Sequence, residues 1–110
     1  MDATLFEVCL QLPGDARLVD AVSDVAATAA RYAGCADVDA AAFATVVEGV
    51  MAQCLGGALM SVVVRRQHGP VEVLIECPKQ FEPAPVQDQR ISIGWATEGG
   101  RSMCRVSRSL

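Results

Sequence analysis

Several features that mark well-known protein classes are missing from this sequence of 110 residues. No run of about 18 apolar residues occurs, so we expect no membrane-spanning helix. The first residues lack a basic segment followed by an apolar one, so the sequence predicts no signal peptide and a cytoplasmic location. Nothing resembles a concentrated basic surface and the formal net charge is −4, so we expect no nucleic-acid partner.

Patterns typical of metal sites, disulfides and hydrolytic triads are also missing. The 5 cysteines are widely spaced, no C-x-x-C pair occurs, and His68 is the only histidine. This pattern favours buried, reduced thiols over a disulfide framework or a zinc site. Because His68 precedes Gly69-Pro70, we expect it in an exposed loop. The serines lack a nucleophile-elbow context, so a Ser-His-Asp triad has no support.

What the chain does contain is apolar residues, at 52% of the sequence, with alanine supplying many of them. This fraction argues against disorder, and the length suits one domain, residues 1–110, with a single two-layer core. The abundant alanine predicts helices that pack closely through small side chains.

Two helices are predicted after a first strand, which spans residues 5–12 and alternates in polarity. Asp15 is the predicted N-cap of the first helix, which starts at Ala16 and stops at Gly34. Asp37 or Asp39 is predicted to cap the second helix, which ends at Gly56-Gly57. The predicted core stripe of the first helix comprises Leu18, Val22, Val25, Ala29 and Ala33.

Four further strands are predicted in two hairpins, at residues 59–66, 71–77, 90–96 and 102–107. In the second of these, Glu72, Leu74 and Glu76 share a face that we expect to be mostly solvated. The last-quarter arginines, Arg108 included, are also expected on a solvated strand face, and Trp95 in the core. Residues 78–89 contain three prolines and no periodicity, so they are predicted to be a loop.

The predicted fold is therefore α+β, with the element order β-α-α-β-β-β-β. Two helices with one apolar stripe each, and a sheet with one apolar face, bury each other best as a two-layer sandwich. The sequence predicts two helices on one face of a mixed or antiparallel sheet of about five strands.

Three segments resemble the anti-sigma-factor serine kinases of the histidine-kinase-like (GHKL) ATPase superfamily. Residues 6–15 look like the first strand of that family and its "LP" step into the first helix. Residues 32–35, Tyr-Ala-Gly-Cys, resemble the end of that helix. Residues 44–52 resemble the segment called the N-box, in which a Glu is followed four residues later by an Asn.

The resemblance implies that Glu48 occupies the position of the N-box glutamate, which in the family handles nucleotide and Mg²⁺. Here the position four residues later is Ala52, and Gln53 is rotated by about 100° from it on a helix. The relic nucleotide-binding residues implied are Glu48, Ala52 and Gln53. Without the asparagine, the chain cannot hold Mg²⁺ in the way the family does.

The other nucleotide-handling segments of the family have no counterpart here. After the strand at residues 71–77 the family carries an Asp-x-Gly-x-Gly box and a mobile lid, whereas this chain reads Cys-Pro-Lys-Gln-Phe-Glu-Pro. Gly99-Gly100 is not followed by a helix N-terminus that could bind a phosphate. The chain therefore lacks the groups that hold the metal and offset the phosphate charge in phosphoryl transfer. We expect no enzyme activity and no cofactor.

The leading hypothesis is a non-catalytic regulatory module of anti-sigma-factor type in bacterial transcription, which has lost its nucleotide site. The resemblance implies a sigma-like factor or its antagonist as partner, or self-association as a homodimer through free strand edges. The predicted partner-binding residues are on the exposed face of the first helix and at Glu48: Arg17, Asp20, Asp24, Arg31 and Glu48.

Two alternatives remain open from the sequence. One is a diverged domain that still binds ATP with Mg²⁺, or another small ligand, in a pocket lined by Glu48, Gln53 and the loop residues Lys79-Gln80. A deep cavity beside Glu48 would favour it. The other is an α+β domain of unrelated ancestry.

Overall fold

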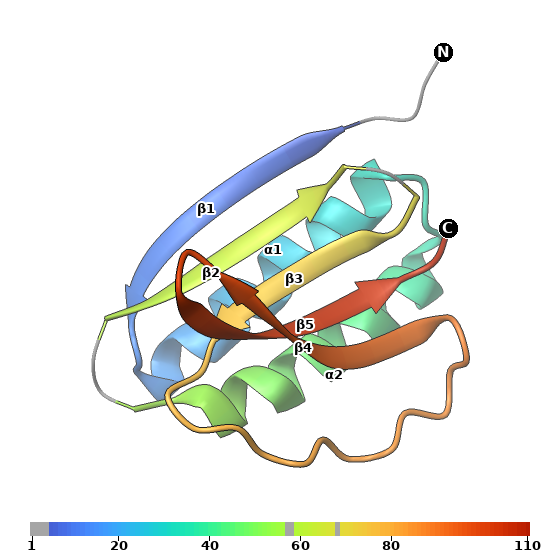
Figure 1. Cartoon of the computed structure of the whole chain (residues 1–110). Helices are drawn as coiled ribbons and strands as arrows, with labels where there is room; N and C mark the ends of the chain where they lie inside the picture. Colours follow the sequence, from blue (N-terminus) through green and yellow to red (C-terminus); the bar gives the residue numbers. More distant parts are fainter. Residues whose placement is uncertain (1–4, 57–58, 68) are drawn as a thin grey trace.

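The computed structural model describes residues 5–56, 59–67 and 69–110. The chain forms strand β1 (Phe6–Pro13), the short 3-10 helix η1 (Ala16–Leu18), and helices α1 (Val19–Tyr32) and α2 (Asp37–Cys54). Strands β2 (Leu59–Arg66), β3 (Val71–Glu76), β4 (Ile91–Glu98) and β5 (Arg101–Arg108) follow. The predicted order of elements is confirmed, with boundaries shifted by at most a few residues (Figure 1).

The five strands form one antiparallel sheet in the order β1-β2-β3-β5-β4. Both predicted hairpins are present, and β5 inserts between β3 and β4. The β4–β5 turn consists of Gly99 and Gly100, which have φ values of 58° and 78°. Only glycine adopts such angles without strain, so this pair determines a tight two-residue turn. The sheet therefore has β1 and β4 at its two edges.

Both helices cover the same face of the sheet (Figure 1). Alternate residues of the central strands point toward them, including Val62, Val73 and Val106, which are fully buried. From the helices, Phe43 and Met51 are also fully buried. The helices pack through small residues, and the Ser23 hydroxyl donates to the Ala44 carbonyl at 3.4 Å. The predicted two-layer sandwich is confirmed.

The predicted N-cap Asp15 caps the short helix η1 that leads into α1, whereas the N-cap of α1 itself is Leu18, without a side-chain hydrogen bond. The predicted caps of the second helix are wrong. Asp15 accepts a hydrogen bond from the Arg17 backbone N–H at 2.9 Å, and Gly34 ends α1 with a φ of 109°. In α2 the N-cap is Ala36, which has no side-chain acceptor, and Asp37 and Asp39 lie inside the first turn. In that turn a carboxylate interacts favourably with the positive end of the helix dipole, so acids there need not be caps.

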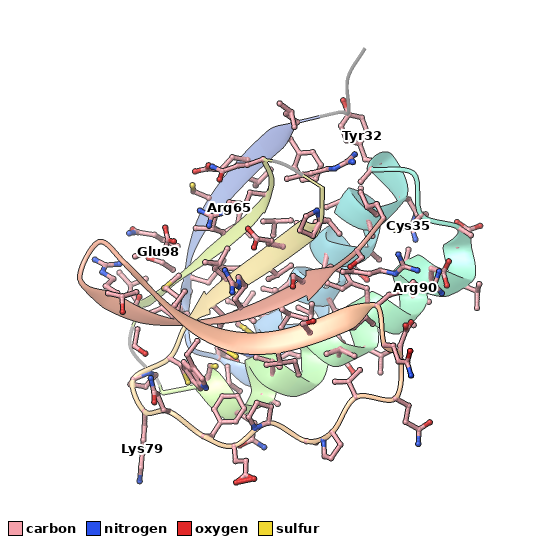
Figure 2. All side chains as sticks on the ribbon, turned by 45° about the vertical axis from the view of Figure 1, so that its right-hand side comes forward. Tyr32, Cys35, Arg65, Lys79, Arg90 and Glu98 are labelled. Carbon is pink, nitrogen blue, oxygen red and sulfur yellow. The ribbon has the colours of Figure 1, made fainter. Side chains whose placement is uncertain are left out.

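The sheet face opposite the helices is less solvated than predicted. Leu74 and Met103 lie on that face and are only 1% and 3% exposed. The β4–β5 hairpin twists across it, so that Glu98 at the hairpin end lies 3.5 Å from Arg65 of β2 (Figure 2). Alternation predicts which face a side chain takes, but it cannot predict that a distant hairpin covers that face.

The connection from β3 to β4, residues 77–90, contains no helix, as predicted. Its Phe81 ring meets the Trp95 ring edge-on, with centroids 5.4 Å apart, and both pack against the core. Trp95 is half-buried, in line with its predicted core role. No helix among the described residues is long and apolar enough to cross a membrane.

Candidate functional site

The predicted relic residues lie on the outward side of α2. Glu48, Ala52 and Gln53 are all exposed. The Glu48 side chain makes no hydrogen bond or ion pair with any residue that the structure describes. It lines neither of the two grooves described below, whereas Gln53 lines the larger one. Of the three predicted relic residues, only Gln53 therefore lines one of these grooves.

This groove, called the α2 groove below, lies between α2, the 77–90 connection and β4. Its volume is about 780 Å³. The residues that line it are Ala42, Thr45, Val46, Gly49, Val50, Gln53, residues 81–88, Ile91 and Ile93. Neither Lys79 nor Gln80, the loop residues predicted to line a pocket, belongs to this set, and Lys79 points away from the body of the molecule (Figure 2).

The charges around the α2 groove do not suit a phosphate. Its only charged lining residues are the acids Glu82 and Asp88, and no lysine or arginine is among them. A nucleotide triphosphate needs cations or aimed backbone N–H groups to offset its charge. The groove is therefore suited to a neutral or apolar group more than to a nucleotide.

One end of the α2 groove is held by a network of ion pairs that the sequence did not predict. Arg90 Nη2 is 3.4 Å from Asp39 Oδ1, and Arg90 Nε is 3.6 Å from Asp88 Oδ1. Arg108 Nη2 is 3.3 Å from Asp39 Oδ2. The network joins the end of the 77–90 connection, near the labelled Arg90 of Figure 2, to the first turn of α2 and the end of β5.

Within this network the titration of Asp88 and the burial of Arg108 are both unusual. The Arg90 backbone N–H, 2.9 Å from Asp88 Oδ1, lowers the pKa of that carboxyl, and the charges of Arg90 and Arg108 lower it further. Arg108 is 3% exposed, so its predicted solvated position is wrong. Its Nε and Nη2 have no well-aligned hydrogen-bond acceptor among the described residues, which leaves Asp39 as the main compensation for its charge.

The predicted partner-binding residues of the first helix are all exposed, and those of α1 recur at a spacing that places them on one side of the helix. Arg17 lies in η1 and pairs with Asp15 at 2.6 Å, and this contact lowers the pKa of Asp15. Asp20, Asp24 and Arg31 lie along α1. Of these, Asp24 lines a second groove, between α1 and the edge strand β1.

This second groove, called the α1–β1 groove below, has a volume of about 390 Å³ and an almost wholly apolar lining. The residues that line it are Phe6, Val8, Asp24, Val25, Thr28, Ala29 and Tyr32. The Phe6 and Tyr32 rings meet edge-on at its end, with centroids 5.7 Å apart. Leu5, Val8 and Tyr32 are 60%, 43% and 66% exposed, so large apolar side chains gather here in contact with solvent.

The sequence contained one unrecognised signal of the α1–β1 groove. Val25 and Ala29 belong to the predicted core stripe of the first helix, yet both are only half-buried. The buried stripe of α1 is rotated from the predicted one and runs through Val22, Ala26 and Ala30. The apolar surface of α1 is thus wider than the sheet covers, and the remainder faces the groove.

The cysteines differ from the predicted all-buried set. Cys54, Cys77 and Cys104 are buried, but Cys35 is half-buried and Cys9 is exposed at the centre of β1. Burial raises the pKa of Cys104 to about 11 and also raises that of Cys54. These buried thiols are therefore poor nucleophiles at neutral pH. In the described part of the chain no group of three His, Cys, Asp or Glu side chains is placed to hold a metal ion.

Comparison with known proteins assigns no class. No family model matches the chain, and no curated protein matches it. The geometry of the two grooves is therefore the basis for a functional proposal.

Proposed function

We propose that this protein is a non-catalytic protein-interaction module and that it binds its partner at β1 and the α1–β1 groove. The observation that carries the proposal is a free strand edge beside an apolar groove. An extended peptide can add to such an edge through main-chain hydrogen bonds and place alternate side chains in the groove beside it. Exposed apolar surface of this kind marks interaction sites.

The surroundings of Glu48 support the non-catalytic part of the proposal. A general base must lie within hydrogen-bond reach of a bound substrate, and its pKa is usually tuned by burial or by neighbours. Glu48 is exposed and lines neither the α2 groove nor the α1–β1 groove. Ala52 offers no metal ligand, and the α2 groove contains acids where a nucleotide needs cations.

The resemblance to anti-sigma-type kinases indicates which partners to try first. They are a sigma-like factor, an antagonist of such a factor, or a second copy of the chain. In this proposal the module acts in the cytoplasm in transcription regulation. The free cysteines and the exposed, charged face of α1 are compatible with that setting.

The binding surface is tested by capture with matched variants. Val8→Lys places a charge on the edge strand inside the groove, and Val38→Lys makes the same change at a 75% exposed valine of α2 that lines neither groove. We expect the wild type and Val38→Lys to retain the same partner and Val8→Lys to lose it, with all three equally folded by circular dichroism. Equal capture by Val8→Lys would contradict the proposal.

A second function, small-ligand binding, is favoured by the size of the α2 groove. Isothermal titration calorimetry with ATP and ADP, with and without Mg²⁺, tests its nucleotide form, with thermal shift as a check. We expect no heat and no change in melting temperature. Mg²⁺-dependent binding that is abolished by Glu48→Ala would mean that a nucleotide site has been rebuilt from other residues.

A further inference from the structure

The edge strand β1 lacks the features by which proteins usually prevent edge-to-edge pairing. All eight of its residues are in register with β2, from Phe6 opposite Arg66 to Pro13 opposite Leu59. Protective devices on edges are lysines, inward-pointing charges, bulges and internal prolines. The strand contains one charge, Glu7, which points away from the helices, and its one proline is the terminal Pro13. It therefore presents a long and regular edge.

We propose that the partner of this edge is β1 of a second copy, paired antiparallel about a two-fold axis that passes at Cys9. This inference rests on the proposed function, because it names the occupant of the same surface. The result is one continuous sheet of two protomers with the helices of both on one side. A two-fold interface uses the same patch twice, so the patch must be complementary to itself.

The sheet pleat and Pro13 select the register. Side chains alternate between faces, so helix-facing residues of β1 can oppose only helix-facing residues of the second β1. The axis must then pass at a residue, and the two central choices are Cys9 and Leu10. An axis at Leu10 places Pro13, which has no N–H, inside the ladder opposite Glu7. An axis at Cys9 leaves Pro13 at the end, outside the pairs formed by residues 6–12.

With the axis at Cys9, the helix-facing row is complementary to the α1–β1 groove. Val8 then opposes the partner's Leu10, and Phe6 opposes the partner's Leu12. Val8 and Phe6 are the two β1 residues that line the groove. Leu10 and Leu12 are half-buried in one protomer. The dimer therefore places Leu10 and Leu12 of each copy beside the apolar groove of the other copy. The leucines and the groove then bury each other's apolar surface.

The outer row is also complementary in this register. Glu7 opposes the partner's Gln11, so a carboxylate meets an amide and no like charges face each other. Cys9 opposes the partner's Cys9. Directly opposed residues of antiparallel strands have Cα atoms about 4.5 to 5.5 Å apart. That spacing lies within the range of roughly 4.4 to 6.8 Å that a disulfide requires, so Cys9 can report the register.

Light scattering and oxidative cross-linking test the proposal together. In a Cys35→Ser background Cys9 is the one exposed cysteine that remains. We expect a dimer in solution and, with copper phenanthroline and air as oxidant, a covalent dimer that Cys9→Ser prevents. A monomer at every concentration, or a dimer that does not cross-link through Cys9, would overturn the proposal.

A reciprocal pair of variants at Gln11 separates the register from effects on folding. Gln11→Lys places an ammonium group opposite the partner's Glu7 at two symmetric points of the interface, and these attractions are expected to tighten the dimer several-fold. Gln11→Glu creates two repulsions at the same points and is expected to weaken it several-fold, and added salt should reduce both changes. Changes in the same direction would contradict the register.

The failure of this inference is distinguishable from that of the proposed function. A monomeric wild type whose Val8→Lys variant loses a different captured protein would end the second-copy proposal and leave the interaction module standing. Undiminished capture by Val8→Lys, together with a monomeric wild type, would end both.

Discussion

At the scale of single residues, Arg108 shows how burial changes the role of a charge. The sequence suggests a solvated strand arginine, whereas the structure buries it at the end of β5, beside Asp39. A buried cation without a counter-charge is strongly destabilising, so Asp39 acts as its compensating partner. The pair also links α2 to the network at the end of the α2 groove.

We expect Asp39→Asn to lower the free energy of unfolding by about 2 to 4 kcal/mol, because it removes the ion-pair partner of the buried Arg108. The lower part of the range allows for the partial exposure of Asp39. Asp37→Asn is the matched control: it removes an acid from the same helical turn, but Asp37 is exposed and forms no ion pair with a described residue. Urea denaturation measures both, and equal losses would contradict the role of Asp39.

At the scale of elements, α2 is stable through packing despite a glycine at its centre. Gly49 lies on the exposed side of the helix, and a Cβ at this position meets nothing within 4 Å. Its backbone is helical, so no special φ requires glycine there. What the glycine does is widen the α2 groove, which it lines.

Gly49→Ala is therefore expected to raise the free energy of unfolding by about 0.5 to 1 kcal/mol, since alanine loses less backbone entropy in a helix. Gly100→Ala is the contrasting variant, because Gly100 has a φ of 78° in the β4–β5 turn and alanine is strained there. Thermal denaturation should show opposite signs. Destabilisation by Gly49→Ala would mean that the space beside it is filled in solution.

Acid is expected to weaken the attachment of the 77–90 connection, because the Asp88 carboxylate becomes protonated and loses its charge. Its pKa is lowered in the folded state, so the unfolded chain binds a proton more readily than the folded one. The stabilisation is therefore complete above the unfolded pKa of about 4 and is lost as pH falls through the lower folded pKa.

Asp88→Asn is accordingly expected to destabilise the protein at neutral pH and to make no difference once the wild-type carboxyl is protonated. Urea midpoints of the two proteins, measured from pH 7 down to about pH 2, give the comparison. A constant difference over that range would show that the carboxylate charge is not responsible.

At the scale of the whole molecule, apolar contacts extend to both faces of the sheet. The helices cover one face, and on the other face Leu74 of β3 and Met103 of β5 are buried where the β4–β5 hairpin twists across the sheet. Arg65 lies over this second cluster, where its Nε donates to Glu72 at 3.1 Å. Burial lowers the pKa of Arg65, but the hydrogen bonds to Glu72 and Glu98 outweigh that effect and raise it.

Leu74→Ala is expected to lower the free energy of unfolding by about 2 to 3 kcal/mol. This loss is close to that of a core truncation, although Leu74 lies on the sheet face that points away from the helices. Val63→Ala, on the same face but half-buried, should cost less than half as much. Chemical denaturation checks both values. A negligible effect of Leu74→Ala would indicate that the hairpin does not cover this face in solution.

By itself, the sequence determined the order of elements, the hairpins and the helix end at Gly34, because periodicity, turn chemistry and caps act between neighbours in the chain. The sequence alone also shows that the chain lacks the Asn and the Asp-x-Gly box with which the anti-sigma-type kinases it resembles bind nucleotide. Only the tertiary structure decided the strand order, the burial of Arg108, the cover over Leu74 and the two grooves. Each of these features depends on segments that are far apart in sequence and come together on packing. The alternation of residues along one strand or helix does not indicate which distant segment will pack against it.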